Sequence, residues 1–311
     1  MFQTHSNSNP EAQVEARADL DSSSHSSTTA NGSAEYLWTD WPRVRNVIEY
    51  VLRAEKPYTF YGHGELDVTH LFEKMEFLRK NARILLSLNT YLIYAISRIA
   101  MKHEKARTFK FKKKCIVFKN VDISVPILKI LPNGVKVPVF YLVREANTKS
   151  LAEINEEMRC AIKSDLANDP IVKFRRSLLK RPLFIQSLIY RHIFKNPIRT
   201  KKFFGNIGLT NLQYLGFSSP FVGLPPNIYT CQFSAGSVTE RFVPDQDKKP
   251  VLRKMLMLGA GMDHLIMDGL CISSFGNDLA AMLAKAEGID EKFVLETNAY
   301  KNSRKQKAGK P

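Results

Sequence analysis

The stretch that decides the fold is residues 121–154, which read VDISVPILKILPNGVKVPVFYLVREANTKSLAEI. Its first part alternates apolar and polar side chains, as expected for a strand with one buried face, with apolar residues at Val121, Ile123, Val125 and Ile127. Pro-Asn-Gly at residues 132–134 then predicts a turn into a second apolar strand. Ser150 and Glu153 have the spacing of a capping box. The stretch therefore predicts an antiparallel hairpin that leads into a capped helix.

Helices and strands alternate on both sides of this stretch. Apolar residues recur every three or four positions after Asp67 and after Ser87, and both residues are good helix caps. A third such helix is expected from Ser273 to Ala284. Further strands are expected at residues 57–64, where a turn follows, and at 206–212, 228–238 and 251–262. This alternation predicts an α/β sandwich of two layers with a mixed sheet.

The formal net charge of +16 is concentrated in two segments. Residues 173–202 hold ten Lys or Arg and no acidic residue, and residues 102–114 hold seven against Glu104 alone. The first segment also carries Phe, Leu and Ile at helical spacing, interrupted by Pro182 and ended near Pro197. It predicts a basic amphipathic helical pair, inserted at residues 164–204. Such charge favours an anionic partner, which is nucleic acid, a membrane surface or an anionic substrate.

The two ends of the chain differ from its middle. Residues 1–34 contain eight serines and almost no large apolar side chain, which predicts a disordered tail rich in Ser and Asn. Residues 299–311 predict a basic polar tail, so the folded domain is expected at 35–298. No apolar run is long enough to span a membrane and no signal peptide opens the chain. We therefore expect a soluble, cytoplasmic protein.

The cysteines give no sign of a metal site. They lie far apart, without CxxC or Cys/His ligand spacing, at Cys115, Cys160, Cys231 and Cys271. Each is found in an apolar stretch, which favours reduced cysteines in the core of a cytosolic protein. We expect no bound metal.

The motif DHLIMDG at residues 263–269 is the best candidate for chemistry. His264 directly follows an apolar strand, and such a rigid support at a strand end allows a side chain to reach a ligand. Imidazole titrates near neutral pH, so His264 can remove a proton from an attacking nucleophile. Asp268 fits a structural carboxylate, and Gly269 permits a tight turn. Among the other histidines only His63, between two glycines, has a comparable claim, and a structural role is favoured there.

This motif resembles the DHRxxDG signature of the catalytic cores of 2-oxo-acid dehydrogenase dihydrolipoyl acyltransferases, and the related HHxxxDG of chloramphenicol acetyltransferases. Other stretches resemble that family in the same order, and GNIGLTNLQYLG with LPPNIYT is similar to its GTFTISNLG with NPPEAAI. The remaining similar stretches are GELDVTHLFEKMEFLRKNA, SLNTYLIYAISRIA and residues 121–154. The resemblance extends over residues 59–288 except for 165–203.

The resemblance implies a chloramphenicol-acetyltransferase-like fold and an acyltransferase that uses an acyl-thioester, with coenzyme A as co-substrate. It makes His264 the general base, Asp268 the structural carboxylate and Thr210 the hydroxyl that donates to the oxyanion of the tetrahedral intermediate. It also implies a homotrimer, in which the histidine of one subunit faces the hydroxyl of its neighbour. The residues that contact coenzyme A are not assigned by it.

Two positions depart from the family pattern: Leu265 replaces the signature's arginine, and Asn227 replaces the glutamate after the paired prolines.

We expect a stand-alone member of the family, because no lipoyl domain or subunit-binding segment precedes the core. We therefore also expect no covalently bound lipoyl group. A second hypothesis is a non-catalytic relative whose basic segments bind an anionic membrane, which would make it a peripheral membrane protein, or nucleic acid. Bulky aliphatic groups among the charges disfavour nucleic acid. A third is a dehydrogenase-complex core that borrows a lipoyl domain from another chain.

Overall fold

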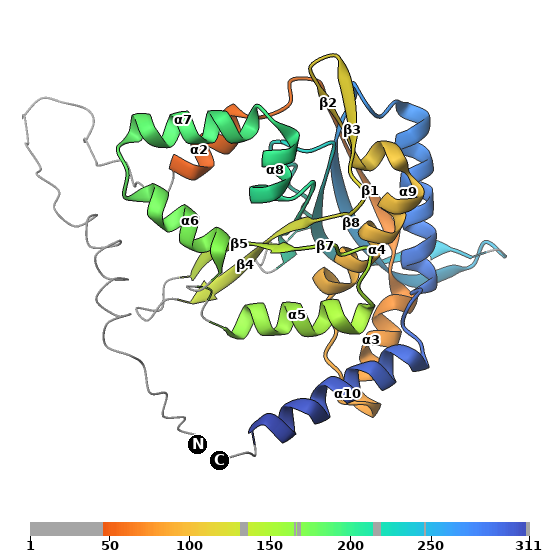
Figure 1. The fold of residues 1–311 in the computed structure, drawn as a ribbon. Helices are drawn as coiled ribbons and strands as arrows, with labels where there is room; N and C mark the ends of the chain where they lie inside the picture. Colours follow the sequence, from red (N-terminus) through yellow and green to blue (C-terminus); the bar gives the residue numbers. More distant parts are fainter. Residues whose placement is uncertain are drawn as a thin grey trace, which may run out of the picture.

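The architecture is seen in a computed structural model, which describes residues 46–130, 136–164, 166, 169–213, 219–245 and 247–308 (Figure 1). The expected disordered tail at residues 1–34 lies outside these ranges, as does the Pro-Asn-Gly turn at 132–134.

A mixed sheet of six strands forms the centre of the fold, as predicted. Its middle pairs, β7 with β6 and β6 with β4, are parallel, and the outer pairs are antiparallel. The strands follow the order β1 (Thr59–Asp67), β8 (Pro250–Asp263), β7 (Cys231–Pro244), β6 (Ile207–Asn211), β4 (Ile123–Ile130) and β5 (Lys136–Val143).

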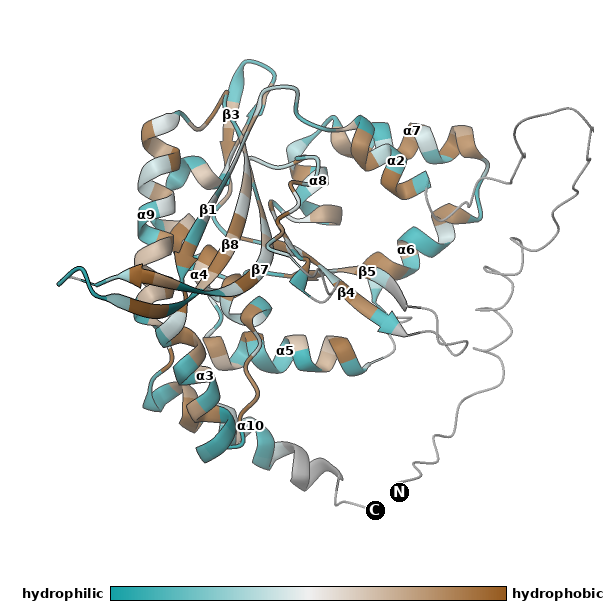
Figure 2. Ribbon diagram, turned by 180° about the vertical axis from the view of Figure 1, so that it is seen from behind, coloured by the Kyte–Doolittle hydropathy of each residue, from teal (hydrophilic) through white to brown (hydrophobic). Residues whose placement is uncertain are grey.

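Helices pack on one face of this sheet and enclose the main hydrophobic core. They are α3 (Thr69–Asn81), α4 (Leu88–Lys102), α5 (Leu151–Lys163), α9 (Gly269–Lys285) and α10 (Glu291–Ala308). Strand side chains such as Ile123 and Phe233 belong to the same buried cluster as Tyr91 and Ile96 of α4, and the Phe233 ring stacks on Phe275 of α9. Figure 2 shows these apolar parts of β7, β8 and α4 together near the middle of the molecule. The predicted sandwich of sheet and helices is confirmed.

Local sequence signals account for the starts of α4 and α5. At α3 the cap position is Val68 and not the expected Asp67, although Asp67 Oδ1 accepts from the Thr69 amide at 2.8 Å. The Ser87 hydroxyl accepts a hydrogen bond from the Thr90 amide at 3.1 Å, which caps α4. The capping box before α5 is confirmed, because Ser150 Oγ accepts from the Glu153 amide at 3.2 Å and Glu153 Oε2 accepts from the Ser150 amide at 2.7 Å. Since β4 and β5 pair antiparallel from Ile123 opposite Val143, the hairpin is confirmed too.

The basic segment folds into three helices rather than the expected pair. They are α6 (Pro170–Leu179), α7 (Leu183–Phe194) and α8 (Pro197–Phe204). Pro197 begins a helix instead of ending one, because the first helical position needs no N–H and Asn196 caps it by accepting from the Ile198 amide at 2.9 Å. These helices surround a second apolar cluster with α2 (Asn46–Arg53), built around Phe109, Tyr190 and Tyr229.

A short hairpin that the sequence analysis missed lies beside this cluster. It consists of β2 (Thr108–Phe111) and β3 (Lys114–Val117), preceded by the 3₁₀ turn η3 (Glu104–Arg107). It belongs to the basic segment at residues 102–114, whose lysines obscure the strand alternation. Phe109 points into the second cluster while Lys110 is exposed.

Other element boundaries and the cysteines also differ from expectation. The basic tail from residue 299 is part of α10 as far as Ala308, β1 continues past Gly64 without a turn, and α9 begins at Gly269 instead of Ser273. The four cysteines form no disulfide with one another, but Cys115 and Cys160 are exposed, so these two are not core residues. Cys115 is exposed because the β2–β3 hairpin lies outside the six-stranded sheet.

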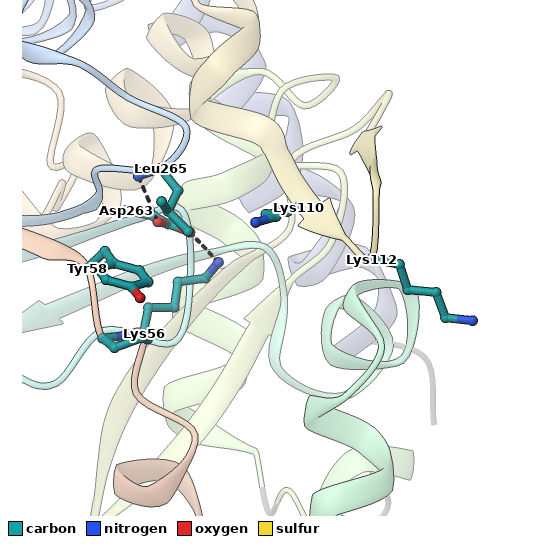
Figure 3. A pocket seen from close by; sticks show the side chains of 7 residues that line it. Lys56, Tyr58, Lys110, Lys112, Asp263 and Leu265 are labelled. Atoms are coloured by element: carbon teal, nitrogen blue, oxygen red, sulfur yellow. Dashed lines mark hydrogen bonds and ion pairs between the residues drawn. The ribbon is translucent and has the colours of Figure 1, made fainter.

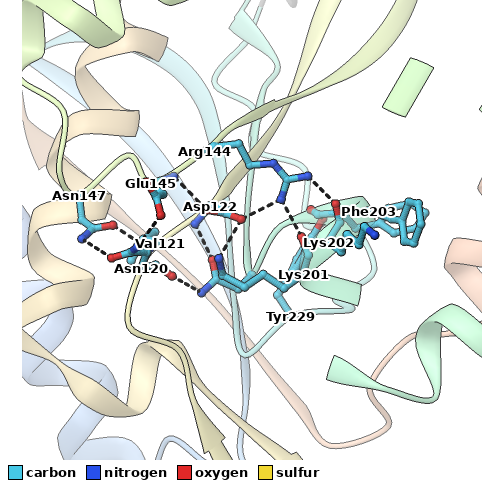
Figure 4. Close-up of polar contacts among 12 residues, drawn as sticks. Asn120, Val121, Asp122, Arg144, Glu145, Asn147, Lys201, Lys202, Phe203 and Tyr229 are labelled. Carbon is cyan, nitrogen blue, oxygen red and sulfur yellow. Dashed lines mark hydrogen bonds and ion pairs between the residues drawn. The ribbon is translucent and has the colours of Figure 1, made fainter. Parts of the chain in front are cut away.

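A buried carboxylate joins β4 and β5 to the end of α8 (Figure 4). Asp122 accepts from the Glu145 amide at 2.9 Å and pairs with Arg144 and Lys201, each at 2.8 Å. Burial raises the pKa of this carboxyl, but the amide and the two cations outweigh it and lower the pKa overall. Gly205 is required next to it, because its φ is 79° and a Cβ would lie 2.6 Å from the Asp122 carbonyl oxygen.

We expect Asp122→Asn to lower the free energy of unfolding by about 2–3 kcal/mol, because an amide nitrogen would face Arg144 and Lys201. Urea denaturation measures this, with the exposed Asp247→Asn as the control. The pKa of Asp122 is lower in the folded state than in the unfolded chain. Its contribution to the free energy of unfolding is therefore complete above about pH 4, and it is lost as the pH falls through the folded-state pKa. Equal stability of parent and variant at neutral pH would contradict this account.

Candidate active site

His264 lies at the first position after β8, where the chain leaves the sheet. Its backbone amide donates to the Tyr58 carbonyl at 2.8 Å, which fixes the direction of the turn. The imidazole is exposed and meets only the edge of the Phe60 ring, with ring centres 6.3 Å apart. Within the part of the chain that the structure describes, the ring makes no hydrogen bond. Its nitrogens are therefore available to an incoming molecule.

The turn that carries His264 is held by a buried ion pair. The Asp263 side chain is only 3% exposed, and Lys56 Nζ lies 2.5 Å from its Oδ2. Oδ1 of the same carboxylate accepts from the Leu265 amide at 3.2 Å. The Lys56 amine also lies over the Phe109 ring, 5.2 Å from its centre. Sequence reasoning missed Lys56, because it precedes Asp263 by 207 positions and belongs to no motif.

Asp268 caps α9. Its Oδ1 accepts from the Cys271 amide at 2.9 Å, and Lys105 Nζ lies 3.0 Å from its Oδ2. The Cys271 amide first, and then Lys105, lower the pKa of this exposed carboxyl below its usual range. The cationic partner of this carboxylate is a lysine.

Thr210 lies far from His264 within one chain. It is paired with Ser234 on β7, which is paired in turn with Gly259 on β8. With strands about 4.8 Å apart and about 3.3 Å per residue, Thr210 lies roughly 16 Å from Asp263, where the His264 turn begins. The hydroxyl also faces away from the main helices, since its neighbour Leu209 belongs to the core. The structure does not bring Thr210 and His264 together in a single subunit.

A basic pocket of about 270 Å³ opens beside the His264 turn (Figure 3). It is lined by Lys56, Pro57, Tyr58, Lys110, Lys112, Asp263 and Leu265. Asp263 is already paired with Lys56, so Lys110 and Lys112 give the pocket an excess of positive charge. Both come from the β2–β3 hairpin, and their place beside His264 was not evident from the sequence. The basic segment at 102–114 was the signal that could have found them.

The two departures from the family pattern lie next to this pocket. Leu265 is 52% exposed and lines it directly. Asn227 is fully buried, and its carbonyl accepts from the Lys56 amide at 2.8 Å while its Oδ1 accepts from the Tyr229 amide at 2.9 Å. Asn227 thus supports the backbone of Lys56, the residue that pairs with Asp263. In the described part of the chain, no three His, Cys, Asp or Glu side chains converge as metal ligands would.

Comparison with known families supports the predicted resemblance. Residues 42–169 match the family described as 2-oxoacid dehydrogenases acyltransferase (catalytic domain). The dihydrolipoyllysine-residue acetyltransferase component of the pyruvate dehydrogenase complex from Rickettsia prowazekii is 22% identical over 264 residues, which are 81% of this chain and 56% of that protein. The chain therefore spans little more than half the length of the curated relatives that it matches first.

Solved structures confirm the fold class. A probable dihydrolipoamide acetyltransferase from Listeria monocytogenes gives a TM-score of 0.58 at 18% identity, covering 82% of this chain and 96% of that one. The cubic core of a pyruvate dehydrogenase multienzyme complex gives 0.59 at 16% identity, with 84% and 96% covered. The dihydrolipoamide acetyltransferase of Azotobacter vinelandii gives 0.58 at 14% identity, with the same coverage. The expected resemblance to acyltransferase cores is confirmed.

Proposed function

We propose that this protein is an acyltransferase that exchanges an acyl group between coenzyme A and a second nucleophile, with His264 as general base. The observation that carries the proposal is the placement of His264. Its imidazole is exposed at the end of a core strand, on a turn fixed by a buried ion pair, next to a lysine-lined pocket. The match of residues 42–169 to an acyltransferase family agrees with this chemistry.

In the proposed reaction the imidazole of His264 takes the proton of the acceptor as the acceptor attacks the thioester carbonyl. The carbonyl π electrons move to oxygen, and the Thr210 hydroxyl donates a hydrogen bond to the resulting oxyanion. When the intermediate collapses, the C–S bond breaks and the leaving thiolate receives the proton from the imidazolium. The acyl group is then on the acceptor, and His264 is neutral again.

The spacing of the three residues supports these roles. The study of the Azotobacter vinelandii enzyme concerns a serine, a histidine and an asparagine in its catalytic mechanism, and there the serine precedes the histidine by 52 positions and the asparagine follows it by 4. Here Thr210 precedes His264 by 54 positions and Asp268 follows it by 4. Threonine carries the same hydroxyl donor as serine, and aspartate offers the same capping oxygen as asparagine.

We also propose that the lysine-lined pocket receives the phosphate groups of coenzyme A. Lys110 and Lys112 form no ion pair with the described residues, and the Lys112 amine lies over the Phe111 ring, 5.7 Å from its centre, at the edge of the pocket. An incoming anion could therefore pair with both lysines. Lys56 holds Asp263 in place and is less available for this purpose. A charged carrier would thereby be bound close to the base that acts on its thioester.

Finally, we propose a homotrimer in which the active site forms between subunits. The separation of roughly 16 Å between Thr210 and the start of the His264 turn excludes a shared oxyanion and base within one chain. A neighbouring subunit supplies the missing partner when three copies are related by a threefold axis. A relative of this fold is found in the cubic core of a multienzyme complex.

His264→Ala should slow acyl transfer by about 10²- to 10⁴-fold with little change in melting temperature, because the imidazole is exposed and contacts only the edge of the partly exposed Phe60 ring. Release of free thiol from acyl-coenzyme A measures the rate. His63→Ala is the matched control, since His63 is also exposed but lies on the edge strand β1. Equal rates for the parent and His264→Ala would contradict the proposed mechanism.

The double variant Lys110→Gln, Lys112→Gln should raise KM for acyl-coenzyme A by about tenfold, because two phosphate partners are lost. KM for the corresponding acyl-pantetheine, which lacks the adenosine phosphates, should not change. The control is Lys113→Gln with Lys114→Gln, which removes two exposed lysines of the same hairpin that do not line the pocket. An equal rise for both thioesters would show that the lysines act on folding or on the acyl group.

Mixing two inactive variants tests the shared site. If His264 and Thr210 meet across an interface, refolding His264→Ala together with Thr210→Ala in equal amounts should give roughly a quarter of the interfaces an intact pair. Activity should rise well above the mean of the two parents, while a site within one chain would stay defective in every subunit. Light scattering must show trimers and exchange of subunits. A monomer, or a mixture no better than its parents, would rule out the shared site.

A further inference from the structure

Helix α7 exposes an apolar strip on the side that faces away from the protein. Phe184 is 72% exposed and Leu188 is 68% exposed, with Leu183 at 58% beside them. The opposite side of the helix packs into the second apolar cluster through Tyr190 and Ile193. Because the opposite side of the helix packs against the protein, these exposed side chains cannot turn toward another apolar surface of the described chain. Figures 1 and 2 show α7 at the periphery of the molecule.

Basic side chains lie farther along the same face of α7. Arg191 and Lys195 follow Phe184 and Leu188 at spacings of three and four, so all four lie along one side of α7. Both are exposed, as are Arg181 before the helix and Arg199 on α8. None of these four cations forms an ion pair with another described residue, and the segment 170–204 has no acidic side chain to offer one. The face is therefore apolar at one end and cationic at the other.

We propose that this face of α7, with the start of α8, docks on a membrane surface that contains anionic lipids. An amphipathic helix of this kind lies in the plane of the interface with its apolar side chains buried about 5–10 Å deep. Phe184 and Leu188 would enter the acyl boundary, while each arginine or lysine near an anionic leaflet contributes about 1 kcal/mol. Every helix within the described ranges is too short or too polar to cross a bilayer, so the contact is peripheral.

The chemistry of the face favours lipid over the other partners. A nucleic acid would use the cations but would gain nothing from Leu183 and Leu188, and its bases stack on aromatic rings, of which only Phe184 is exposed on this face. The centre of a subunit interface would be depleted of unpaired lysine, whereas this face carries several unpaired cations. A surface that offers both acyl chains and phosphates matches both halves of the face.

Docking here would also place the basic pocket near the membrane. Helix α8 packs against β2, and Lys110 of β2 lines the pocket beside His264. The inference does not depend on acyl transfer, since it rests on the exposed residues of α7 and of the chain next to it.

Vesicle flotation of the full chain tests the proposal. The protein should float with vesicles of phosphatidylcholine that contain about one-third phosphatidylserine, stay behind with phosphatidylcholine alone, and detach as salt rises from about 0.1 M to 1 M. Phe184→Ser with Leu188→Ser should weaken the binding by about tenfold or more, because two large apolar groups no longer insert. Arg191→Gln with Lys195→Gln should weaken it on anionic vesicles as well.

The matched control is Phe242→Ser with Leu295→Ser, which removes two side chains of comparable exposure, 74% and 70%, elsewhere on the surface. This variant should float like the parent. Failure of the parent to float, or an equal loss in the control, would overturn the proposal. If the Phe184/Leu188 variant instead changes the subunit number in light scattering, the face is an interface between copies. If the parent binds a labelled RNA and no vesicle, its partner is nucleic acid.

Discussion

The ion pair between Lys56 and Asp263 is the contact on which the candidate site depends. Asp263 is the last residue of β8 and is almost wholly buried, so its carboxylate requires a cation at close range. Lys56 supplies that cation from the segment before β1, and Asn227 and Phe109 hold its backbone and its amine. Four distant parts of the chain thus converge behind one turn. His264 directly follows Asp263, so these contacts fix the direction in which the chain presents His264.

The topology of the sheet holds Thr210 and His264 apart within one chain. β6 and β7 run parallel while β8 runs antiparallel to both, and Thr210 lies across β7 from Gly259, four residues before the end of β8. The base and the oxyanion donor that the family resemblance implies are therefore held on the same rigid sheet at a fixed distance. Assembly around a symmetry axis is the physical means by which such a pair can meet.

The positive charge of the chain is divided between two surfaces with different surroundings. The lysines of β2–β3 lie around a pocket next to His264, where they can bind a compact anion. Arg181, Arg191, Lys195 and Arg199 lie on an open face with the exposed Phe184 and Leu188, where they match an extended anionic surface. The same residue types thus favour different partners, because the shape and the apolar neighbours of each surface differ.

The sequence by itself determined the elements whose causes are local. The hairpin at 121–143, the caps at Ser87 and Ser150, and the strand that ends before His264 follow from alternation, cap chemistry and apolar runs, and so does the α/β class. It misjudged Pro197, since a proline can end one helix or begin the next, and only Asn196 as a cap decided between them. The sequence did not predict the long-range contacts. Three placements depend on strand order: Lys56 beside Asp263, Lys110 in one pocket with Asp263 and Leu265, and Thr210 far from the His264 turn. Strand order brings residues together or separates them without leaving a periodic signal in the chain.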